Sequence, residues 1–540
     1  MEQQDLNKRL LLALALSFLV FIGYSYLFSP KNVPASQESN RTTVSTAAST
    51  ADKSVPQVEK GKAAVEKKAP GTDVSDRKVL LNVVSHTFKM TFDELGRIEQ
   101  FELLEKKYQN AEGHNLKILG ANVAKPLEIR FADAALNAEA FKTPYTASLS
   151  GTVDAKNGPV TVTLTQKLSK VTVTKKVTIQ PNGAYTLDLH LSDNVPYFIT
   201  PGHRPLADNS RYMLVRGALI KTADGVITVI EDGDAKGDET FKNAQIASAF
   251  DRYVATMFYD FKKGMDVSVL KVGKDDPLLF VKGSQSLHLG GYIGPKEYHT
   301  LASINPELTD AIEFGWFTFL SKPFFKVLLW LHSHIGNWGW AIILFTLLVK
   351  LILFPLSYKG MMSMQKLKDL APKMKELREK YKGDPAKLNM KMMEMYKKHG
   401  ANPMGGCLPM LLQIPVFFAL YRVLLNADEL QGAVWIHGWI DNLAAADPYY
   451  ILPVLMGLSM WFQQRITPNN FTDPMQEKIF KFFPILMAGM FIIMPFPSGL
   501  VLYWVVNNIF TIGQQYVINR AYAKHKAAVA AAAHKKGKES

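Results

Sequence analysis

Cysteine is almost absent from the sequence, and tryptophan is absent from its N-terminal half. Cys407 is the single cysteine among 540 residues, which excludes an internal disulfide framework and any metal site built on a cysteine pair. All eight tryptophans lie between Trp316 and Trp504. The hydrophobic residues, 48% of the chain, are also unevenly spread, as in a membrane protein that carries a large soluble part.

Acidic side chains are missing from five long apolar runs in the C-terminal part. The runs cover residues 338–356, 407–425, 449–465, 479–494 and 497–516. Transporters driven by protons or cations normally need carboxylates inside the membrane, so this absence argues against that class. The sequence also lacks a phosphate-binding loop, a zincin motif and a G-x-S-x-G frame, and His332 and His334 have no third metal ligand in view. We therefore expect no enzymatic activity, no cofactor and no bound metal.

Lys350 lies inside the first of these runs. A cation near the middle of a membrane span costs roughly 2.5–3.5 kcal/mol on insertion scales, so such a residue usually faces protein or water and serves a function. The five runs contain no carboxylate to pair with it. Its anionic partner is therefore something that arrives, or else water and polar neighbours neutralise it.

Polar residues recur on the runs around this lysine. They are Thr346, one turn before it, Gln413 in the second run, and Asn507, Thr511 and Gln514 on one face of the last run. Converging, these side chains would form a wet groove in the inner half of the membrane. The alternative is that they hold helices together through hydrogen bonds worth about 0.6–2 kcal/mol each, and we favour that interpretation for Gln463 and Gln464.

Charge and hydrophobicity together predict the membrane topology. Residues 10–28 form a further apolar run, which follows Lys8 and Arg9 and lacks a cleavage pattern, so it predicts an uncleaved anchor. Residues 359–399 carry twelve Lys/Arg against five Asp/Glu, and residues 519–540 carry six against one. Six spans place both termini and both basic segments in the cytoplasm, as the positive-inside rule requires. The basic segments suit anionic phospholipids or RNA, or they only mark this topology.

The remaining segments complete a predicted domain order. Residues 79–310 alternate with a period of two and include a hairpin signal at Pro181-Asn182-Gly183, which predicts a large antiparallel β-sandwich. The segment 311–335 predicts an amphipathic helix in the outer interface, since a further span there would move a basic segment outside. The full order is an anchor (1–28), a flexible tether (29–78), the β-rich domain (79–310), the interfacial helix (311–335), a five-span core (336–518) with a cytoplasmic helical hairpin (359–403), and a basic cytoplasmic tail (519–540).

The cytoplasmic hairpin is rich in methionine. Two helical patterns flank Gly383-Asp384-Pro385, where Gly ends the first helix, Asp caps the second and Pro occupies its first turn. Flexible thioethers suit contacts with varied apolar segments, although they could equally fill the seam of the hairpin. The predicted contact residues are Met362, Met364, Met374, Met392 and Met395.

Several short motifs carry a resemblance to a known family. They are YIGPK (292–296), GNWG (336–339), NPMGGCLP (402–409), LQIP (412–415), DPYYILP (447–453), TDPMQ (472–476) and FPSGL (496–500). Through them and its overall layout, the chain resembles the Gram-negative form of the YidC/oxidase-assembly family of insertases. The resemblance implies a multi-pass protein of the bacterial inner membrane, with its large domain in the periplasm, that inserts membrane proteins and helps them fold.

The family resemblance also implies a site and partners. A groove open to the cytoplasm and to lipid takes in the polar tail of the protein being inserted. The groove cation falls at Lys350, with matching polar positions at Thr346 and Gln413. In the last span, Tyr503 matches and Trp504 replaces a common second Tyr, just as Lys350 replaces a common Arg. The implied partners are nascent membrane proteins, the Sec translocon, and ribosomes bound through the basic loop and tail.

Two other functions stay open at this point. A static scaffold for the assembly of membrane complexes would use the same layout without inserting anything. A small-solute transporter would need a conduction path, and the missing acidic relay argues against it.

Overall fold

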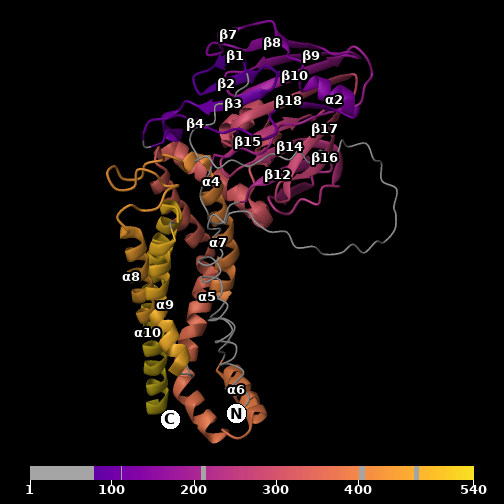
Figure 1. The fold of residues 1–540 in the computed structure, drawn as a ribbon. Coiled ribbons are helices and arrows are strands. Elements are labelled where there is room, and N and C mark those ends of the chain that lie inside the picture. Colours follow the sequence, from indigo (N-terminus) through magenta and orange to yellow (C-terminus); the bar gives the residue numbers. More distant parts are fainter. Residues whose placement is uncertain are drawn as a thin grey trace, which may run out of the picture.

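A β-rich body stands at one end of a bundle of long helices (Figure 1). The computed structural model describes residues 78–110, 112–207, 215–399, 408–467, 474–494 and 496–539. The predicted anchor and nearly all of the predicted tether lie outside the described residues. The hairpin formed by α5 (Trp338–Lys380) and α6 (Pro385–Lys398), and the end of α10 (Ser498–Glu539), lie at the far end of the bundle from the β-domain (Figure 1).

The β-domain consists of two sheets. The smaller sheet has the strand order β4-β3-β2-β1-β7, and its only parallel pair among the described strands is β1 with β7. Its strands are β1 (Val79–Val84), β2 (Phe88–Asp93), β3 (Ile98–Leu103), β4 (Leu116–Lys117) and β7 (Gly151–Asp154).

The larger sheet has thirteen strands, in the order β5-β11-β17-β16-β14-β15-β18-β10-β9-β8-β6, with β12 paired to β14 and β13 paired to β12. Its strands are β5 (Ile129–Phe131), β6 (Thr146–Ala147), β8 (Val160–Lys167), β9 (Thr172–Ile179), β10 (Ala184–Leu191), β11 (Tyr197–Ile199), β12 (Gly217–Thr222), β13 (Ile227–Glu231), β14 (Thr240–Phe250), β15 (Val254–Tyr259), β16 (Met265–Val272), β17 (Asp276–Gly283) and β18 (Ser286–Pro295).

The period-two pattern explains how the sheets pack. In β8, Val162 and Leu164 are buried while Thr163 between them is not, because successive side chains of a strand point to opposite faces. These residues join one core with apolar residues of the smaller sheet. The predicted β-sandwich is thus confirmed.

The predicted hairpin turn joins β9 to β10. Gly183 has a φ of +86°, and a Cβ there would lie 2.5 Å from the carbonyl oxygen of Ile293. Only glycine fits this turn, because it has no Cβ and tolerates a positive φ.

The described helices run mostly along the bundle. They are α2 (Ala134–Ala140), α3 (Tyr298–Ile304), α4 (Thr318–Ile335), α5 (Trp338–Lys380), α6 (Pro385–Lys398), α7 (Leu408–Asn426), α8 (Ile451–Ile466), α9 (Pro474–Ile493) and α10 (Ser498–Glu539). Short 3-10 turns are η1 (Lys106–Tyr108), η2 (Pro306–Ala311), η3 (Gly315–Phe317) and η5 (Asp428–Leu430).

Two helices are longer than their predicted segments. The first span and the first helix of the hairpin form one helix, α5, of 43 residues, although Pro355 and Pro372 lie inside it. Likewise, α10 continues from the last apolar run through the predicted tail. The change from apolar to basic residues means that one part of the helix suits lipid and the other suits water. It does not by itself end the helix.

The predicted boundary of α4 differs from the structure, whereas the predicted start of α6 agrees with it. Residues 311–335 are not one helix, because the 3-10 turns η2 and η3 precede α4, which begins at Thr318. At α6 the predicted cap is present: the Asp384 carboxylate accepts a hydrogen bond from the Lys387 backbone nitrogen at 3.0 Å. Pro385 is the first residue of that helix, as predicted.

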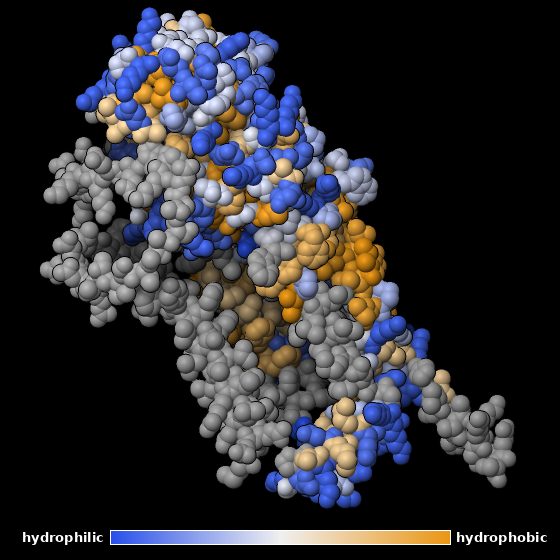
Figure 2. Space-filling model, turned by 90° about the vertical axis from the view of Figure 1, so that its right-hand side faces the viewer, coloured by the Kyte–Doolittle hydropathy of each residue, from blue (hydrophilic) through white to orange (hydrophobic). Residues whose placement is uncertain are grey.

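The bundle presents apolar side chains on its outside. Figure 2 shows hydrophobic residues gathered on the helices below the mostly hydrophilic β-domain. The most exposed of them include Leu351, Ile352, Phe482, Ile485 and Ile493. Within the described ranges, α5 alone combines the length and apolarity needed to cross a membrane. A bundle with an apolar outer surface suits a lipid environment.

The β-domain meets the outer ends of the helices at a buried polar contact. Asp428 follows α7 and is fully buried. Its carboxylate accepts hydrogen bonds from the Tyr108 hydroxyl at 2.6 Å and from Lys107 Nζ at 3.1 Å. The next residue, Glu429, accepts a hydrogen bond from the Tyr298 backbone nitrogen at 2.8 Å. Side chains of the β-domain and of the loop after α7 are therefore fixed to each other.

Glu429 is expected to make this contact sensitive to pH. Burial, followed by the nearby carboxylates of Asp428 and Glu297, raises the pKa of Glu429 from 4.5 to about 7. The pKa of Asp428 and that of Glu105 are also raised, mainly by burial. A raised carboxyl pKa means that the folded state favours the protonated form. The protonated Glu429 side chain therefore stabilises the folded protein fully below about pH 4.5, and this contribution is lost as the pH rises to about 7.

We expect Glu429→Gln to remove this dependence. The shift corresponds to roughly 3 kcal/mol, so the variant should be more stable than the natural protein above pH 7, and the difference should vanish near pH 4.5. Thermal unfolding of the full chain between pH 4.5 and pH 8 measures it. Glu112→Gln, at a side chain that is 76% exposed, is the matched control and should leave the profile unchanged. Parallel profiles for Glu429→Gln and the natural protein would contradict the assignment.

Candidate functional site

Three helices bring polar side chains to Lys350. Lys350 lies on α5, Gln413 on α7 and Thr511 on α10. Lys350 Nζ donates a hydrogen bond to Thr511 Oγ1 at 2.9 Å and lies 3.5 Å from Gln413 Oε1. The sequence prediction that these residues converge therefore agrees with the geometry. We call Lys350, Gln413, Tyr503, Thr511 and Gln514 the polar cluster.

The other two members extend the cluster along α10. Gln413 Nε2 donates a hydrogen bond to the buried Tyr503 hydroxyl at 2.8 Å. Gln514 Nε2 donates to the Lys350 backbone carbonyl at 3.4 Å. Among the described residues, no carboxylate lies within ion-pair distance of Lys350. The ammonium group thus has neutral partners only in this part of the chain.

Two buried oxygens in or beside the cluster have no hydrogen-bond partner among the described residues. They are Asn507 Oδ1 and Gln514 Oε1. Both residues lie one turn from Thr511 on the same side of α10, and Thr511 Oγ1 donates to the Asn507 backbone carbonyl at 2.7 Å. An unpaired buried polar atom costs about 1–3 kcal/mol, so such a group is normally met by water or by a bound molecule.

Two predicted site residues are placed differently. Thr346 is 1% exposed, and its hydroxyl donates to the Ile342 carbonyl at 2.7 Å, so it is already bonded to its own helix. The Trp504 ring packs against Phe417, with 4.7 Å between ring centroids, and against Phe491 at 5.1 Å. Thr346 and Trp504 shape the surroundings of the cluster without bonding to the ammonium group.

Sequence reasoning missed a second polar layer beyond the cluster. Gln515 Nε2 donates to Asn519 Oδ1 at 2.6 Å, and Gln365 of α5 donates to the same atom. Asn519 Nδ2 donates to the Ile466 carbonyl of α8 at 3.2 Å. The layer joins α5, α8 and α10. Its signal in the sequence was the continuation of polar residues at helical spacing after Thr511.

The five predicted methionines of the hairpin fall into two groups. Met374 and Met395 are buried in the seam with Leu367, Leu370 and Tyr396, and Met392 packs against this core. At Met374 and Met395 the seam-filling alternative describes the geometry, because burial leaves little thioether surface for another molecule, and Met392 is only partly buried there. Met362 and Met364 are partly buried on α5 outside that core.

Two methionines that the prediction omitted are exposed. Met390 is 51% exposed and Met393 is 53% exposed, both on α6. Their exposure follows from the helical spacing, since they lie between the positions that face the seam. The hairpin also contacts α10, because Asp369 accepts hydrogen bonds from the Tyr522 hydroxyl and from Lys526 Nζ, each at 2.9 Å.

Comparison with known proteins identifies the family. Residues 330–526 match the family described as 60Kd inner membrane protein, and residues 252–327 match the family described as YidC periplasmic domain. Over 519 residues the chain is 48% identical to the membrane protein insertase YidC of Campylobacter jejuni, covering 96% of this chain and 97% of that protein. The chain belongs to the YidC family of membrane protein insertases.

Further members of the YidC family give the same result. The proteins of Wolinella succinogenes and Helicobacter pylori are 46% and 43% identical to this chain, covering 98% and 97% of it and 98% of each relative. A crystal structure of an active YidC insertase covers 82% of this chain and 92% of its own, at 18% identity and a TM-score of 0.36. The two family matches and the full-length relatives, taken together, identify the β-rich body and the helical bundle as the periplasmic and inner-membrane parts of a YidC-family protein.

Proposed function

We propose that this chain inserts a membrane protein, its client, by holding the client's polar tail against the polar cluster. The observation that carries the proposal is the ammonium group of Lys350, which has only neutral partners among the described residues, next to two unpaired buried oxygens. A carboxylate on the client tail would supply the missing counter-charge. Client amides would pair with the oxygens of Asn507 and Gln514. The site is therefore suited to a passing polar segment.

Three physical effects favour insertion through such a groove. The attraction between Lys350 and an acidic tail is stronger in a low-dielectric groove than in water. A wet groove in the inner half of the membrane shortens the apolar distance that the tail must cross. The membrane potential adds roughly 2.3 kcal/mol per charge per 100 mV and draws acidic tails outward. The client's apolar segment would then slide sideways into lipid.

The proposed topology has six spans. Residues 10–28, the first part of α5, α7, α8, α9 and the first part of α10 cross the inner membrane, with α4 lying in the outer interface and both termini in the cytoplasm. The support is the charge distribution, because the α5–α6 hairpin and the end of α10 are basic while residues 426–447 contain four acidic residues and no Lys or Arg.

The same basic segments would meet the cytoplasmic partners. Ribosomal RNA and anionic phospholipids are polyanions that basic hairpins attract, and the Asp369 bonds to α10 hold the two basic segments together. Cooperation with the Sec translocon rests on family membership alone.

Insertion by the purified protein tests the proposal directly. Proteoliposomes containing only this protein should insert a single-span client with an acidic tail. A photocrosslinking residue at position 507 should capture the client tail during insertion, whereas a residue at exposed Phe482 should not capture that tail. A static scaffold would give assembly contacts without insertion, and that outcome would overturn the proposal.

The exposed methionines of α6 give a second test. Met390→Gln combined with Met393→Gln should weaken client capture by the hairpin roughly thirtyfold, because each half-exposed thioether contributes about 1 kcal/mol when covered. Crosslinking yield against client concentration measures the change. Met374→Gln is the contrasting variant: it puts an amide into the seam and should raise hydrogen exchange across the hairpin. Equal capture by the double variant and the natural protein would remove Met390 and Met393 from the contact surface.

A further inference from the structure

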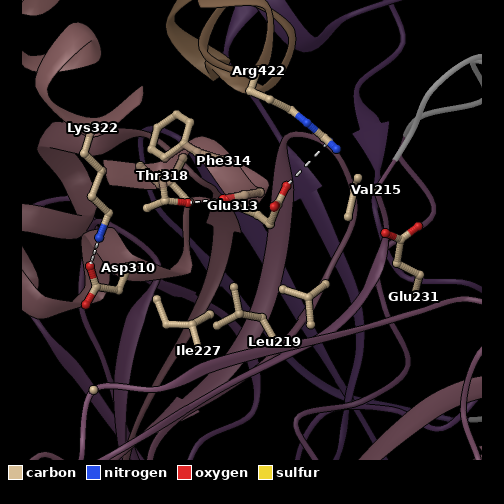
Figure 3. Close-up of a pocket in the computed structure, with 14 residues that line it drawn as sticks. Val215, Leu219, Ile227, Glu231, Asp310, Glu313, Phe314, Thr318, Lys322 and Arg422 are labelled. Atoms are coloured by element: carbon tan, nitrogen blue, oxygen red, sulfur yellow. Dashed lines mark hydrogen bonds and ion pairs between the residues drawn. The ribbon is translucent and has the colours of Figure 1, made fainter. Parts of the chain in front are cut away.

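A cavity of about 560 Å³ lies where the β-domain meets the outer ends of α4 and α7. Its walls come from the β12–β13 hairpin, from η2 and η3, from the first turns of α4, and from Arg422 near the end of α7. Figure 3 shows the charged side chains Lys322, Glu313 and Arg422 facing the apolar side chains Leu219 and Ile227 across it. The volume is that of a small-molecule site, and the lining is amphiphilic.

The charged groups of the cavity are not all satisfied. Glu313 is 8% exposed, and its Oε2 is buried with no hydrogen-bond partner among the described residues. Arg422 Nη1 lies 3.9 Å from that oxygen, which is too far for a hydrogen bond. Asp310 is already paired with Lys322 and, at 3.0 Å, with Lys221. Glu231 remains for a ligand, together with the Glu313–Arg422 ion pair, whose 3.9 Å separation leaves both groups able to form hydrogen bonds.

A glycine keeps the charged end of the cavity open. Gly315 has a φ of +67°, and a Cβ there would lie 3.3 Å from Glu313 Oε1 and 3.4 Å from Arg422 Nε. Any side chain at this position would crowd both groups. The backbone therefore leaves Glu313 and Arg422 accessible from the cavity.

Apolar side chains continue from the cavity down the helices. Thr318 lines the cavity, and its neighbour Phe319 is 74% exposed. Phe418, one turn before Arg422 on α7, is 45% exposed and stacks on Phe317 with 5.9 Å between ring centroids. A ligand with a charged head in the cavity would find an apolar surface for hydrocarbon chains directly beside it.

We infer that this cavity binds the headgroup of an aminophospholipid of the phosphatidylethanolamine type from the outer leaflet of the membrane. Its primary ammonium group donates to Glu313 and Glu231, its phosphate accepts from Arg422, and its acyl chains lie along Phe317, Phe319 and Phe418. A choline headgroup carries no N–H donor for the unpaired Glu313 oxygen. A lipid with a glycerol headgroup carries a net negative charge, which the lining disfavours because it holds three carboxylates and only two cations. Hydrogen bonding and charge therefore select the ethanolamine headgroup.

Lipid titration of the full chain tests the inference. Native mass spectrometry of the detergent-solubilised protein with phosphatidylethanolamine, phosphatidylcholine or phosphatidylglycerol, each alone, should show one phosphatidylethanolamine retained about tenfold more tightly, the effect of one charge-assisted hydrogen bond. Glu313→Gln should abolish the preference. Glu307→Gln is the matched control, because Glu307 pairs with Lys221 outside the cavity and is half exposed. Equal affinity for the three lipids would overturn the inference.

Two further measurements cover the remaining outcomes. Glu231→Gln, at an exposed rim position, should also lower the preference while keeping the melting temperature, so the test stands even if Glu313→Gln does not fold. A photocrosslinking residue at position 227 should capture phosphatidylethanolamine in proteoliposomes. Capture of a translocating client there in place of lipid would overturn the inference and assign the cavity to the client's exit. The lipid assays contain no client, so their result is independent of the role of Lys350.

Discussion

Lys350→Ala is expected to slow the insertion of a client with an acidic tail by about tenfold or more. The estimate follows from the loss of one or more charge-assisted hydrogen bonds between the ammonium group and the tail, each worth about 1.5–3 kcal/mol. Lys350→Arg should support insertion, because a guanidinium carries the same charge and can also bind a carboxylate through two nitrogens. The measurement is the initial insertion rate in proteoliposomes that contain only this protein.

Two controls separate charge from structure in this experiment. Lys350→Met keeps most of the side-chain length without the charge, so it should behave like Lys350→Ala if the charge matters. A client with a neutral tail should be inserted at nearly the same rate by all variants. Insertion of every tested acidic-tailed client at the natural rate by Lys350→Ala would remove the anchor role. Melting temperatures of the variants show whether the freed Thr511 and Gln413 destabilise the bundle.

The convergence on Lys350 was predictable, but the direction of each side chain was not. A buried cation without an acidic partner, polar residues at helical spacing, and the family resemblance together gave Gln413, Tyr503 and Thr511. Spacing could not show that the Thr346 hydroxyl bonds to its own helix. It could not show that Trp504 packs on Phe417, since rotamers depend on the neighbouring helices.

In the fold, too, the features set by local sequence were predictable, whereas those set by contacts between distant segments were not. The alternation of side chains and the turn at Gly183 predicted the sandwich, because strand periodicity and turn chemistry are local properties. The parallel pairing of β1 with β7 and the strand order of the larger sheet depend on contacts far apart in the sequence. The unbroken α5 was missed because the boundary was placed where hydropathy changes, whereas the helix continues through Pro355 and Pro372 to Lys380.

Asp428 is the clearest case of a residue that the sequence undervalued. It counted only as one of four acidic residues in an outer connection. In the structure it is fully buried and accepts hydrogen bonds from Tyr108 and Lys107, which lie more than three hundred positions earlier in the chain. This contact joins the smaller β-sheet region to the helical core, and no local sequence pattern predicts it.

Asp428→Ala is expected to destabilise this junction by about 3–5 kcal/mol, the usual cost of removing one partner from a buried charged pair. Asp428→Asn should cost less, because its amide oxygen still accepts from the Tyr108 hydroxyl. Hydrogen exchange at η1 and η5, together with thermal unfolding, measures the loss. Asp441→Ala, in the same connection with a side chain that is 61% exposed, is the matched control and should change little.

A double-mutant cycle decides whether Lys107 contributes to the stability of this junction. If Lys107 and Asp428 act as a pair, Lys107→Ala should cost much less in the Asp428→Ala background than in the natural protein, because its partner is already gone. Additive effects would mean that the Tyr108 hydroxyl alone holds Asp428. An Asp428→Ala variant no less stable than Asp441→Ala would show that apolar packing fixes the β-domain to the helices. A firm junction also matters for the bundle, since the Arg252 guanidinium of the β-domain donates to the Leu425 carbonyl of α7 at 2.8 Å and so holds the outer end of the helix that carries Gln413.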